Sequence, residues 1–319
     1  MATALYSHPD CLAHEMGADH PESPQRLGAI SDLLIATGLD LALALRDAPQ
    51  AKDEDLRLAH EALYIAELRS LLSEVETSGL RRALDADTVA RPGTLAAVLH
   101  AAGAAVAATD AVIEGEFENA FCATRPPGHH ATRNQAMGFC FVNNVAVAAR
   151  HALNRRGLDR VAVIDFDVHH GNGTEDILAG DERTLMVGFF QHPLYPHSGV
   201  VPMGENMLNL PVPPYTKGPE IRALIEAHWL PQLEAFRPQM LFLSAGFDAH
   251  REDPLGQLGL VEADYAWITQ KLMDVAARHA KGRIVSCLEG GYHLGALARS
   301  VAAHLRVLAG VAGPAALKP

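Results

Sequence analysis

The chain alternates short apolar runs with longer segments in which apolar residues recur every three or four positions. The short runs predict β-strands, and the central ones are apolar throughout, as expected for strands buried on both faces. The predicted strands span residues 2–6, 120–123, 161–167, 184–189, 240–245 and 284–288. The longer segments predict helices over residues 25–37, 62–76, 94–114, 142–156, 219–236, 262–279 and 294–308. This alternation favours an α/β fold with a parallel sheet covered by helices on both faces.

Composition and charge limit the classes of protein to which this chain can belong. The 319 residues are 49% hydrophobic and no linker, repeat or low-complexity segment divides them, so we expect one domain over residues 1–319. The formal net charge of −12 disfavours a nucleic-acid-binding surface, but it does not exclude cationic amines as substrates. Self-association into a homo-oligomer is left open. The cysteines are widely spaced and are expected to be reduced core thiols: Cys11, Cys122, Cys140 and Cys287.

The sequence also bears on targeting. The first residues lack a basic region followed by an apolar signal core. The most apolar long stretch, residues 94–113, carries His100, Thr109 and Asp110, so we expect a buried helix and not a membrane span. These observations predict a cytoplasmic protein with no membrane partner.

The most informative segment is 161–173, which reads V-A-V-I-D-F-D-V-H-H-G-N-G. A core strand ends there in two carboxylates and two imidazoles. Because side chains alternate along a strand, Asp165, Asp167 and His169 are predicted to lie on one side. Their oxygen and nitrogen donors suit Zn²⁺ or Fe²⁺. The alternative, a strand end whose polar residues simply meet solvent, is disfavoured by the density of ionisable groups.

A second apolar strand, residues 240–245, is followed closely by Asp248. The carboxyl ends of parallel strands meet at one edge of a sheet, so Asp248 can join Asp167 and His169 there. Two Asp and one His leave a coordination position open, which is typical of a catalytic metal site. Taken alone, Asp248 could equally be a helix or loop cap.

Two tandem histidines form another cluster. Residues 125–130 read R-P-P-G-H-H after the predicted strand 120–123. The prolines stiffen this loop, and His129 and His130 could exchange protons with a metal-activated water or ligate the metal themselves. With an Asp–His–Asp set available, the acid–base role is the more economical interpretation. A pair of surface histidines is the alternative.

Three further segments carry weaker signals. Residues 289–292 read E-G-G-Y, where paired glycines allow close approach and Tyr292 could donate its hydroxyl to an oxyanion, although such turns are common. Phe139 could line a pocket, and a core aromatic is the alternative. Asp87 could hold substrate at a rim, and a solvated turn carboxylate is the alternative.

Together these segments resemble the zinc-dependent histone deacetylase superfamily and are most similar to its class II-like bacterial amidohydrolases. The matching segments run in order along nearly the whole chain: residues 20–26, 125–130, 138–144, 165–174, 244–248 and 289–292. The resemblance implies an arginase/deacetylase α/β fold with a central parallel sheet of about eight strands.

The resemblance also implies roles for individual residues. It implies a Zn²⁺ ion bound by Asp167, His169 and Asp248, with Fe²⁺ as the alternative. The other catalytic positions are His129, His130, Tyr292, Asp165 as the partner of His129, and Asn172, where class I relatives carry Asp. A structural K⁺ ion would be held by Asp165, Asp167, His169 and main-chain carbonyls near Gly188 and Phe189.

Substrate-binding positions follow from the same resemblance. Phe139, with Gly138, matches one wall of a substrate tunnel, and the opposite wall falls near Leu194 or Tyr195. Arg26 matches a residue of the cavity through which acetate leaves. The remaining substrate-binding positions are Leu255, Asp87, Gly290 and Gly291.

The expected activity is metal-dependent hydrolysis of acylated lysine side chains, or of related N-acetyl amines, to the free amine and acetate. We expect His130 to transfer the protons and His129 to supply electrostatic support. A ureohydrolase is disfavoured because it needs a two-metal cluster, and a non-catalytic acyl-lysine binder would lack Tyr292.

The remaining alternative is an acetylpolyamine amidohydrolase. Polyamine-selective relatives carry Glu at the position of Leu255, so we expect a preference for acyl-lysine. Glu252 and Asp253 lie close enough in sequence to supply the missing charge in part.

Overall fold

The computed structural model describes residues 2–311, whose centre is an eight-stranded sheet with the order β2-β1-β5-β10-β9-β6-β7-β8. Every neighbouring pair of strands in this sheet is parallel. The strands are β1 (Thr3–Ser7), β2 (Leu43–Asp47), β5 (Asn119–Cys122), β6 (Val161–Asp165), β7 (Thr184–Gln191), β8 (Met207–Val212), β9 (Leu241–Ala245) and β10 (Ile284–Leu288). This architecture confirms the predicted parallel sheet of about eight strands.

The sequence pattern missed the two edge strands, β2 and β8. β2 buries only its first residue well, and β8 contains Asn209 and Pro211, so neither reads as a continuous apolar run. Proline is tolerated there because an edge strand leaves part of its main chain unpaired. A short antiparallel hairpin, β3 (Arg82–Ala83) and β4 (Val89–Ala90), was also missed.

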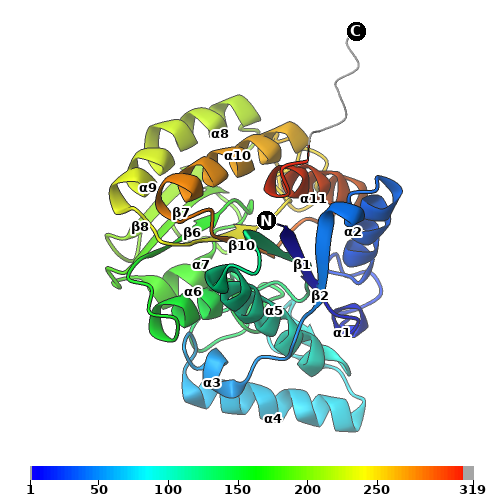
Figure 1. Ribbon diagram of the computed structural model, residues 1–319. Coiled ribbons are helices and arrows are strands. Elements are labelled where there is room, and N and C mark those ends of the chain that lie inside the picture. The colour runs from blue at the N-terminus through cyan, green and yellow to red at the C-terminus, as the bar shows by residue number, and fades with distance from the viewer. Residues whose placement is uncertain (1, 312–319) are drawn as a thin grey trace.

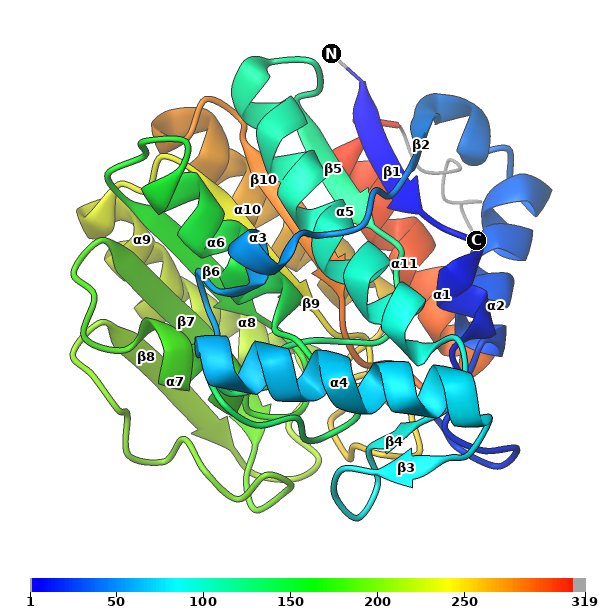
Figure 2. The ribbon, with the colours of Figure 1, turned by 90° about the horizontal axis from the view of Figure 1, so that it is seen from below.

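Helices cover both faces of the sheet (Figure 1). On one face lie α2 (Gln25–Ala36), α8 (Gly218–Leu224), η2 (Ile225–Trp229), α9 (Leu230–Phe236), α10 (Glu262–His279) and α11 (Leu294–Leu308). The other face carries α3 (Asp53–Leu56), α4 (Ala62–Ser78), α5 (Thr94–Glu114), α6 (Asn144–Asn154) and α7 (Asn172–Leu178). Short segments α1 (Asp10–Ala13) and η1 (Asp40–Ala42) complete the described helices. Figure 2 shows α4 lying outside α5 and α6 as an additional layer, with the β3–β4 hairpin beside it.

The most apolar helix, α5, is a core element. It is the one helix within residues 2–311 that is long and apolar enough to cross a membrane, yet 72% of its most apolar stretch is buried inside the protein. Gly103 lets α5 approach the loop after β2, because a Cβ at this position would lie 1.9 Å from the carbonyl oxygen of Pro49. The expectation of a buried helix is confirmed. The four cysteines are likewise buried and free.

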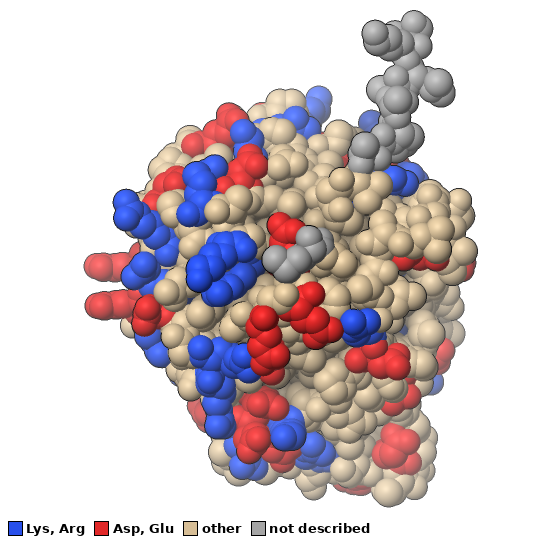
Figure 3. All heavy atoms as spheres, in the orientation of Figure 1, with Lys and Arg blue, Asp and Glu red and all other residues tan. Residues whose placement is uncertain are grey.

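Charged side chains of both signs are interspersed over the face of the molecule drawn in Figure 3. The net charge of −12 is therefore not gathered into a single acidic patch on this face.

Side chains alternate along β6, so that the strand packs against helices on both faces of the sheet before its polar end. Val161 and Val163 pack toward α5 and α6, whereas Ala162 and Ile164 pack toward α10 and α11. β6 ends at Asp165, two residues earlier than predicted, so Asp167 and His169 lie in the loop that follows. Since β5, β6, β9 and β10 are neighbours with the same direction, the loops after them meet at one edge of the sheet.

Candidate active site

Three side chains from two of these loops form a compact set of ligand atoms. Nδ1 of His169 lies 3.0 Å from Oδ1 of Asp167 and 3.2 Å from Oδ2 of Asp248, and the three candidate ligand atoms lie within 4.8 Å of one another. Both aspartates are fully buried. The structure thus brings together the three residues predicted to bind the metal.

The electrostatics of this set suit a divalent cation. Burial, together with the neighbouring charge of Asp167, raises the pKa of Asp248 to about 7. Burial alone would lower the pKa of His169, but its hydrogen bonds to both aspartates outweigh burial and raise that pKa to about 10. Two buried carboxylates around one imidazole concentrate negative charge that a divalent ion would balance. One nitrogen and two oxygen donors fit Zn²⁺ or Fe²⁺.

Two glycines permit this crowding. A Cβ at Gly290 would lie 2.0 Å from Oδ2 of Asp248, and one at Gly246 would lie 2.0 Å from Oδ2 of Asp167. The main-chain N–H of Gly290 also donates to Oδ2 of Asp167 at 2.9 Å. The close approach inferred from the paired glycines therefore exists, but at Gly290 it is to the ligand carboxylates.

The tandem histidines differ in their surroundings. Nδ1 of His129 lies 3.0 Å from Oδ2 of Asp165, and Nδ1 of His130 lies 2.8 Å from Oδ1 of Asn172. Because an amide oxygen only accepts hydrogen bonds, Nδ1 of His130 carries the proton and its Nε2 is left with a lone pair. His130 lines the cavity described below, whereas His129 lies behind it.

These different surroundings shift the pKa values of the two histidines in opposite directions. Burial would lower the pKa of His129, but the charges of Asp167 and Asp165 outweigh burial and raise it well above its ordinary value. Burial lowers the pKa of His130 well below its ordinary value, and the neighbouring imidazoles lower it further. His130 is therefore the imidazole suited to accept a proton at neutral pH.

Glu289 fixes the loop that carries both histidines, a role that the sequence pattern did not predict. Its Oε2 accepts hydrogen bonds from the main-chain N–H groups of Gly128 at 2.7 Å and His129 at 3.1 Å. The side chain is fully buried, and burial raises its pKa to about 7. The only feature of the sequence that could have indicated this role is the position of Glu289 directly before the Gly290-Gly291-Tyr292 turn.

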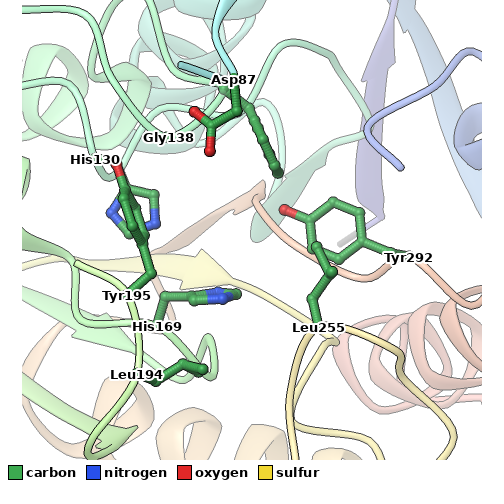
Figure 4. Close-up of a pocket in the computed structure, with 9 residues that line it drawn as sticks. Asp87, His130, Gly138, His169, Leu194, Tyr195, Leu255 and Tyr292 are labelled. Carbon is green, nitrogen blue, oxygen red and sulfur yellow. The ribbon is translucent and has the colours of Figure 1, made fainter. Parts of the chain in front are cut away.

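A cavity of about 240 Å³ opens above the three ligands. It is lined by Asp87, His130, Gly138, Phe139, His169, Leu194, Tyr195, Leu255 and Tyr292. In Figure 4, His130, His169 and Tyr195 lie on one side of the opening, and Tyr292 and Leu255 lie on the other. The rings of Phe139 and Tyr292 meet edge-on at 5.9 Å, and those of His130 and Tyr195 at 5.2 Å.

The β3–β4 hairpin supports the wall formed by Phe139. The carboxylate of Asp85 accepts hydrogen bonds from the N–H of Asp87 at 2.9 Å and of Gly138 at 3.3 Å. The hydroxyl of Thr88 accepts from the N–H of Phe139 at 3.0 Å. Burial and the charge of Asp85 raise the pKa of Asp87, whose carboxylate lies at the opening, to about 6. Sequence reasoning found Asp87 but not Asp85 or Thr88.

Comparisons with known proteins show the family of the chain. A family model described as "Histone deacetylase domain" matches residues 20–308. The chain belongs to the histone deacetylase family. A crystal structure of the HDA15 HD domain, 31% identical, superposes with a TM-score of 0.90 over 99% of this chain and 91% of its own. The predicted arginase/deacetylase fold is confirmed.

Relatives with assigned names fall in the same family. The histone deacetylase-like amidohydrolase of Pseudomonas aeruginosa is 40% identical, over 86% of this chain and 73% of its own length. The probable deacetylase of Archaeoglobus fulgidus is 36% identical, over 98% and 87%. The mouse polyamine deacetylase HDAC10 is also 36% identical, over 97% of this chain and 48% of its own.

In this histone deacetylase family member, Arg26 lies behind the cavity wall. Its Nε donates to the carbonyl oxygen of Gly291 at 2.7 Å and its Nη2 to that of Glu289 at 2.5 Å, while its guanidinium lies 5.0 Å from the ring of Tyr292. Arg26, Gly290 and Gly291 are not among the residues that line this cavity, and their assignment as substrate-binding residues stays a prediction. A role for Arg26 in acetate release stays a prediction.

The residues predicted to hold a monovalent ion come from the adjacent strands β6 and β7 and from the loop that follows β6. Gly188 pairs with Asp165 across β7 and β6, and Phe189 follows it with its ring stacked on Trp229 at 5.6 Å. Asp165 is 2% exposed. A K⁺ ion at this place stays a prediction.

Proposed function

We propose that this protein is a metal-dependent deacetylase that hydrolyses the amide of acylated lysine side chains to the free amine and acetate. The observation that carries the proposal is the Asp167–His169–Asp248 set, of which His169 lines the cavity together with His130 and Tyr292. A proton acceptor, an O–H donor and a place for a Lewis acid are the groups that amide hydrolysis requires.

When bound at this set, Zn²⁺ or Fe²⁺ would supply polarisation of the amide carbonyl and activation of a water molecule. His130, neutral and with Nε2 free, accepts the proton of that water and later delivers it to the leaving amine. His129, held by Asp165, contributes electrostatic support. Tyr292 donates its hydroxyl to the developing oxyanion, a contribution typically worth roughly 3–4 kcal/mol. We also propose that a K⁺ ion beside Asp165 stabilises the loop after β6, which carries Asp167 and His169.

The rim favours acyl-lysine over acetylpolyamines. Leu255 presents an apolar side chain to the cavity, where it can pack against the neutral alkyl part of an acylated lysine. The second candidate, a polyamine deacetylase, is supported by the name of the mouse relative and by the acidic Asp87 at the opening. A non-catalytic binder is disfavoured because Tyr292 lines the cavity. A cytoplasmic location and the lack of nucleic-acid or membrane partners stay predictions from the sequence.

The proposal is tested by turnover of an acetyl-lysine peptide by the metal-loaded enzyme and by its Tyr292→Phe variant. The variant should retain the metal and lose about 10²–10³-fold in kcat with little change in KM, because the phenol acts on charge that develops in the transition state. Absence of turnover by the wild-type protein over a panel of acetyl-lysine peptides would exclude the proposed activity. An unchanged kcat in the variant would remove Tyr292 from the reaction.

A further inference from the structure

The loop of residues 192–206, between β7 and β8, supplies one wall of the cavity through Leu194 and Tyr195. Its outer side is solvated: Val201 is 81% exposed and Met203 is 61% exposed. These outer side chains provide little apolar burial to hold the loop in place. The position of the wall must therefore be set by contacts made on the inner side.

His170, which directly follows the metal-ligand candidate His169, makes the central inner contact. It is 3% exposed, with Nε2 2.9 Å from Oε2 of Glu175 and Nδ1 2.8 Å from the hydroxyl oxygen of Ser198. The carboxylate of Glu175 only accepts hydrogen bonds, so Nε2 of His170 carries the proton. Nδ1 then accepts the hydroxyl proton of Ser198. One imidazole thus joins α7 to the loop three residues beyond Tyr195.

Glu175 extends this connection to the rest of the loop. It is 1% exposed, and its Oε1 accepts hydrogen bonds from the N–H of Met203 and from Nδ2 of Asn209, each at 2.9 Å. Nδ2 of Asn209 also donates to the carbonyl oxygen of Gly199 at 3.0 Å. The buried carboxylate is therefore surrounded by three donors, all of which belong to or contact the loop.

Gly199 shows that the loop is packed closely onto His170. Its φ of +86° is favourable for glycine, and a Cβ there would lie 2.6 Å from ring carbons of His170. The backbone of the loop and the imidazole are thus in direct contact. A side chain at this position would displace one of them.

We propose that His170 and Glu175 are positioning residues that hold the Leu194–Tyr195 wall at a fixed distance from the catalytic groups. The inference rests on the proposed function of the cavity. Glu175 lies in the first turn of α7, which begins at Asn172, the partner of His130. The ring of Tyr195 lies 5.2 Å from that of His130 and 6.4 Å from that of His169. Helix α7 therefore carries both the partner of the proton acceptor and the carboxylate that holds the Leu194–Tyr195 wall.

The test uses the metal-loaded Ser198→Ala variant, which removes the one hydroxyl that joins the loop to His170. Because the wall contacts substrate equally in the ground state and the transition state, KM for an acetyl-lysine peptide should rise about three- to tenfold, with kcat within about twofold. Hydrogen exchange of the main-chain amides of residues 197–203 should accelerate. Metal content should not change. Ser198→Thr, which keeps a hydroxyl, should restore KM toward the wild-type value.

Val201→Ala is the matched control, since Val201 lies in the same loop with an exposed side chain. It should change neither KM nor the exchange rates. Unchanged exchange in Ser198→Ala would show that His170 does not hold the loop. Faster exchange with unchanged KM would show that the loop does not set the wall. Either result overturns the proposal.

A second ligand separates this proposal from the proposed function. An alkyl hydroxamate offers two oxygen donors to a divalent metal and would bind in the same cavity without needing to be hydrolysed. Their Kd should rise in Ser198→Ala by about the same factor as KM, even if no tested peptide is a substrate. A wild-type protein without turnover contradicts the proposed activity, whereas an unchanged hydroxamate Kd contradicts the positioning role.

Discussion

The carboxylate of Asp253 accepts a hydrogen bond from the main-chain N–H of Tyr292, with 2.7 Å between Oδ2 and the nitrogen. The same oxygen accepts from the N–H of His293 at 3.2 Å, and Oδ1 accepts from that of Leu255 at 3.0 Å. Asp253 is 7% exposed. One buried side chain therefore positions both the proposed oxyanion donor and the apolar residue at the rim.

We expect Asp253→Asn to lower kcat by about tenfold or more and to raise KM. An amide in place of the carboxylate leaves at least one main-chain N–H without its acceptor, which typically costs about 1–3 kcal/mol and frees the Tyr292 turn to move. Steady-state kinetics and metal content check this expectation. Glu252→Gln, at the exposed neighbouring position, is the control. Unchanged kcat in Asp253→Asn would show that the turn is held by other contacts.

Asp248→Ala should remove both metal and activity while the fold survives. Asp248 supplies a buried carboxylate to the ligand set, and two remaining ligands bind a divalent ion far more weakly. Metal stoichiometry after dialysis and the circular dichroism spectrum measure the two effects. The exposed Asp32→Ala variant should keep its metal. Full metal occupancy in Asp248→Ala would contradict the ligand assignment.

His130→Ala should damage turnover more than His129→Ala. His130 lines the cavity with its Nε2 free, whereas His129 lies behind it and acts through charge. Because burial depresses the pKa of His130, its neutral form persists above that pKa and kcat/KM should fall on the acid side as it protonates. If His130→Ala no longer shows the fall of kcat/KM at acid pH, this role is supported. A larger loss in His129→Ala would exchange the two roles.

The fold and the ligand set could be predicted because both depend on local pattern. Strands buried on both faces must be apolar, and polar residues that follow them must lie at the edge where parallel strands end. Asp167, His169 and Asp248 satisfy that rule directly. The edge strands β2 and β8 do not, because one face or one edge of each meets solvent and polar residues are tolerated there.

The supporting carboxylates could not be predicted in the same way. Glu289 accepts hydrogen bonds from a loop about 160 residues earlier in the chain, and Asp85 holds a wall about 50 residues later. These contacts depend on how distant loops fold over the sheet, and nothing local distinguishes such a carboxylate from a solvated one. Asp253 illustrates the point, since its sequence neighbours indicate an exposed acidic turn.

His304 should make the protein less stable in acid. It is fully buried between the hydroxyls of Thr269 at 2.7 Å and Ser286 at 3.0 Å, and burial lowers its pKa to about 3. The unfolded chain, with an ordinary histidine pKa of about 6.5, binds the proton first. The free energy of unfolding therefore falls as the pH drops from about 6.5 toward about 3.

Urea unfolding of wild type and His304→Gln at about pH 7 and about pH 4.5 measures this contribution. The wild type should lose more stability than the variant between the two values, by up to about 1.4 kcal/mol per pH unit. Other buried histidines contribute to both proteins alike, so the difference isolates His304. Parallel pH dependences would show that His304 does not titrate on unfolding.

Substrate choice should depend on Leu255, because Leu255 lines the cavity whereas the neighbouring Glu252 and Asp253 do not. The carboxylate of Asp253 is occupied by main-chain donors, and that of Glu252 lies 3.0 Å from Nη2 of Arg299. The expectation that these two residues compensate in part stays a prediction. Asp87 is the carboxylate left in the lining of the cavity.

We expect a higher kcat/KM for an acetyl-lysine peptide than for acetylated putrescine or spermidine. A polyamine keeps a cationic amine after acetylation, and holding it at a partly buried rim requires an opposing carboxylate. Leu255→Glu should shift the ratio of the two kcat/KM values toward polyamines by about five- to tenfold, the effect of about 1 kcal/mol from one partly exposed ion pair. Leu255→Gln, which changes polarity without adding charge, should not produce this shift. Two results would show that charge at this position does not select the substrate. One is a wild-type enzyme that prefers the polyamine, and the other is an equal shift of the kcat/KM ratio in Leu255→Glu and Leu255→Gln.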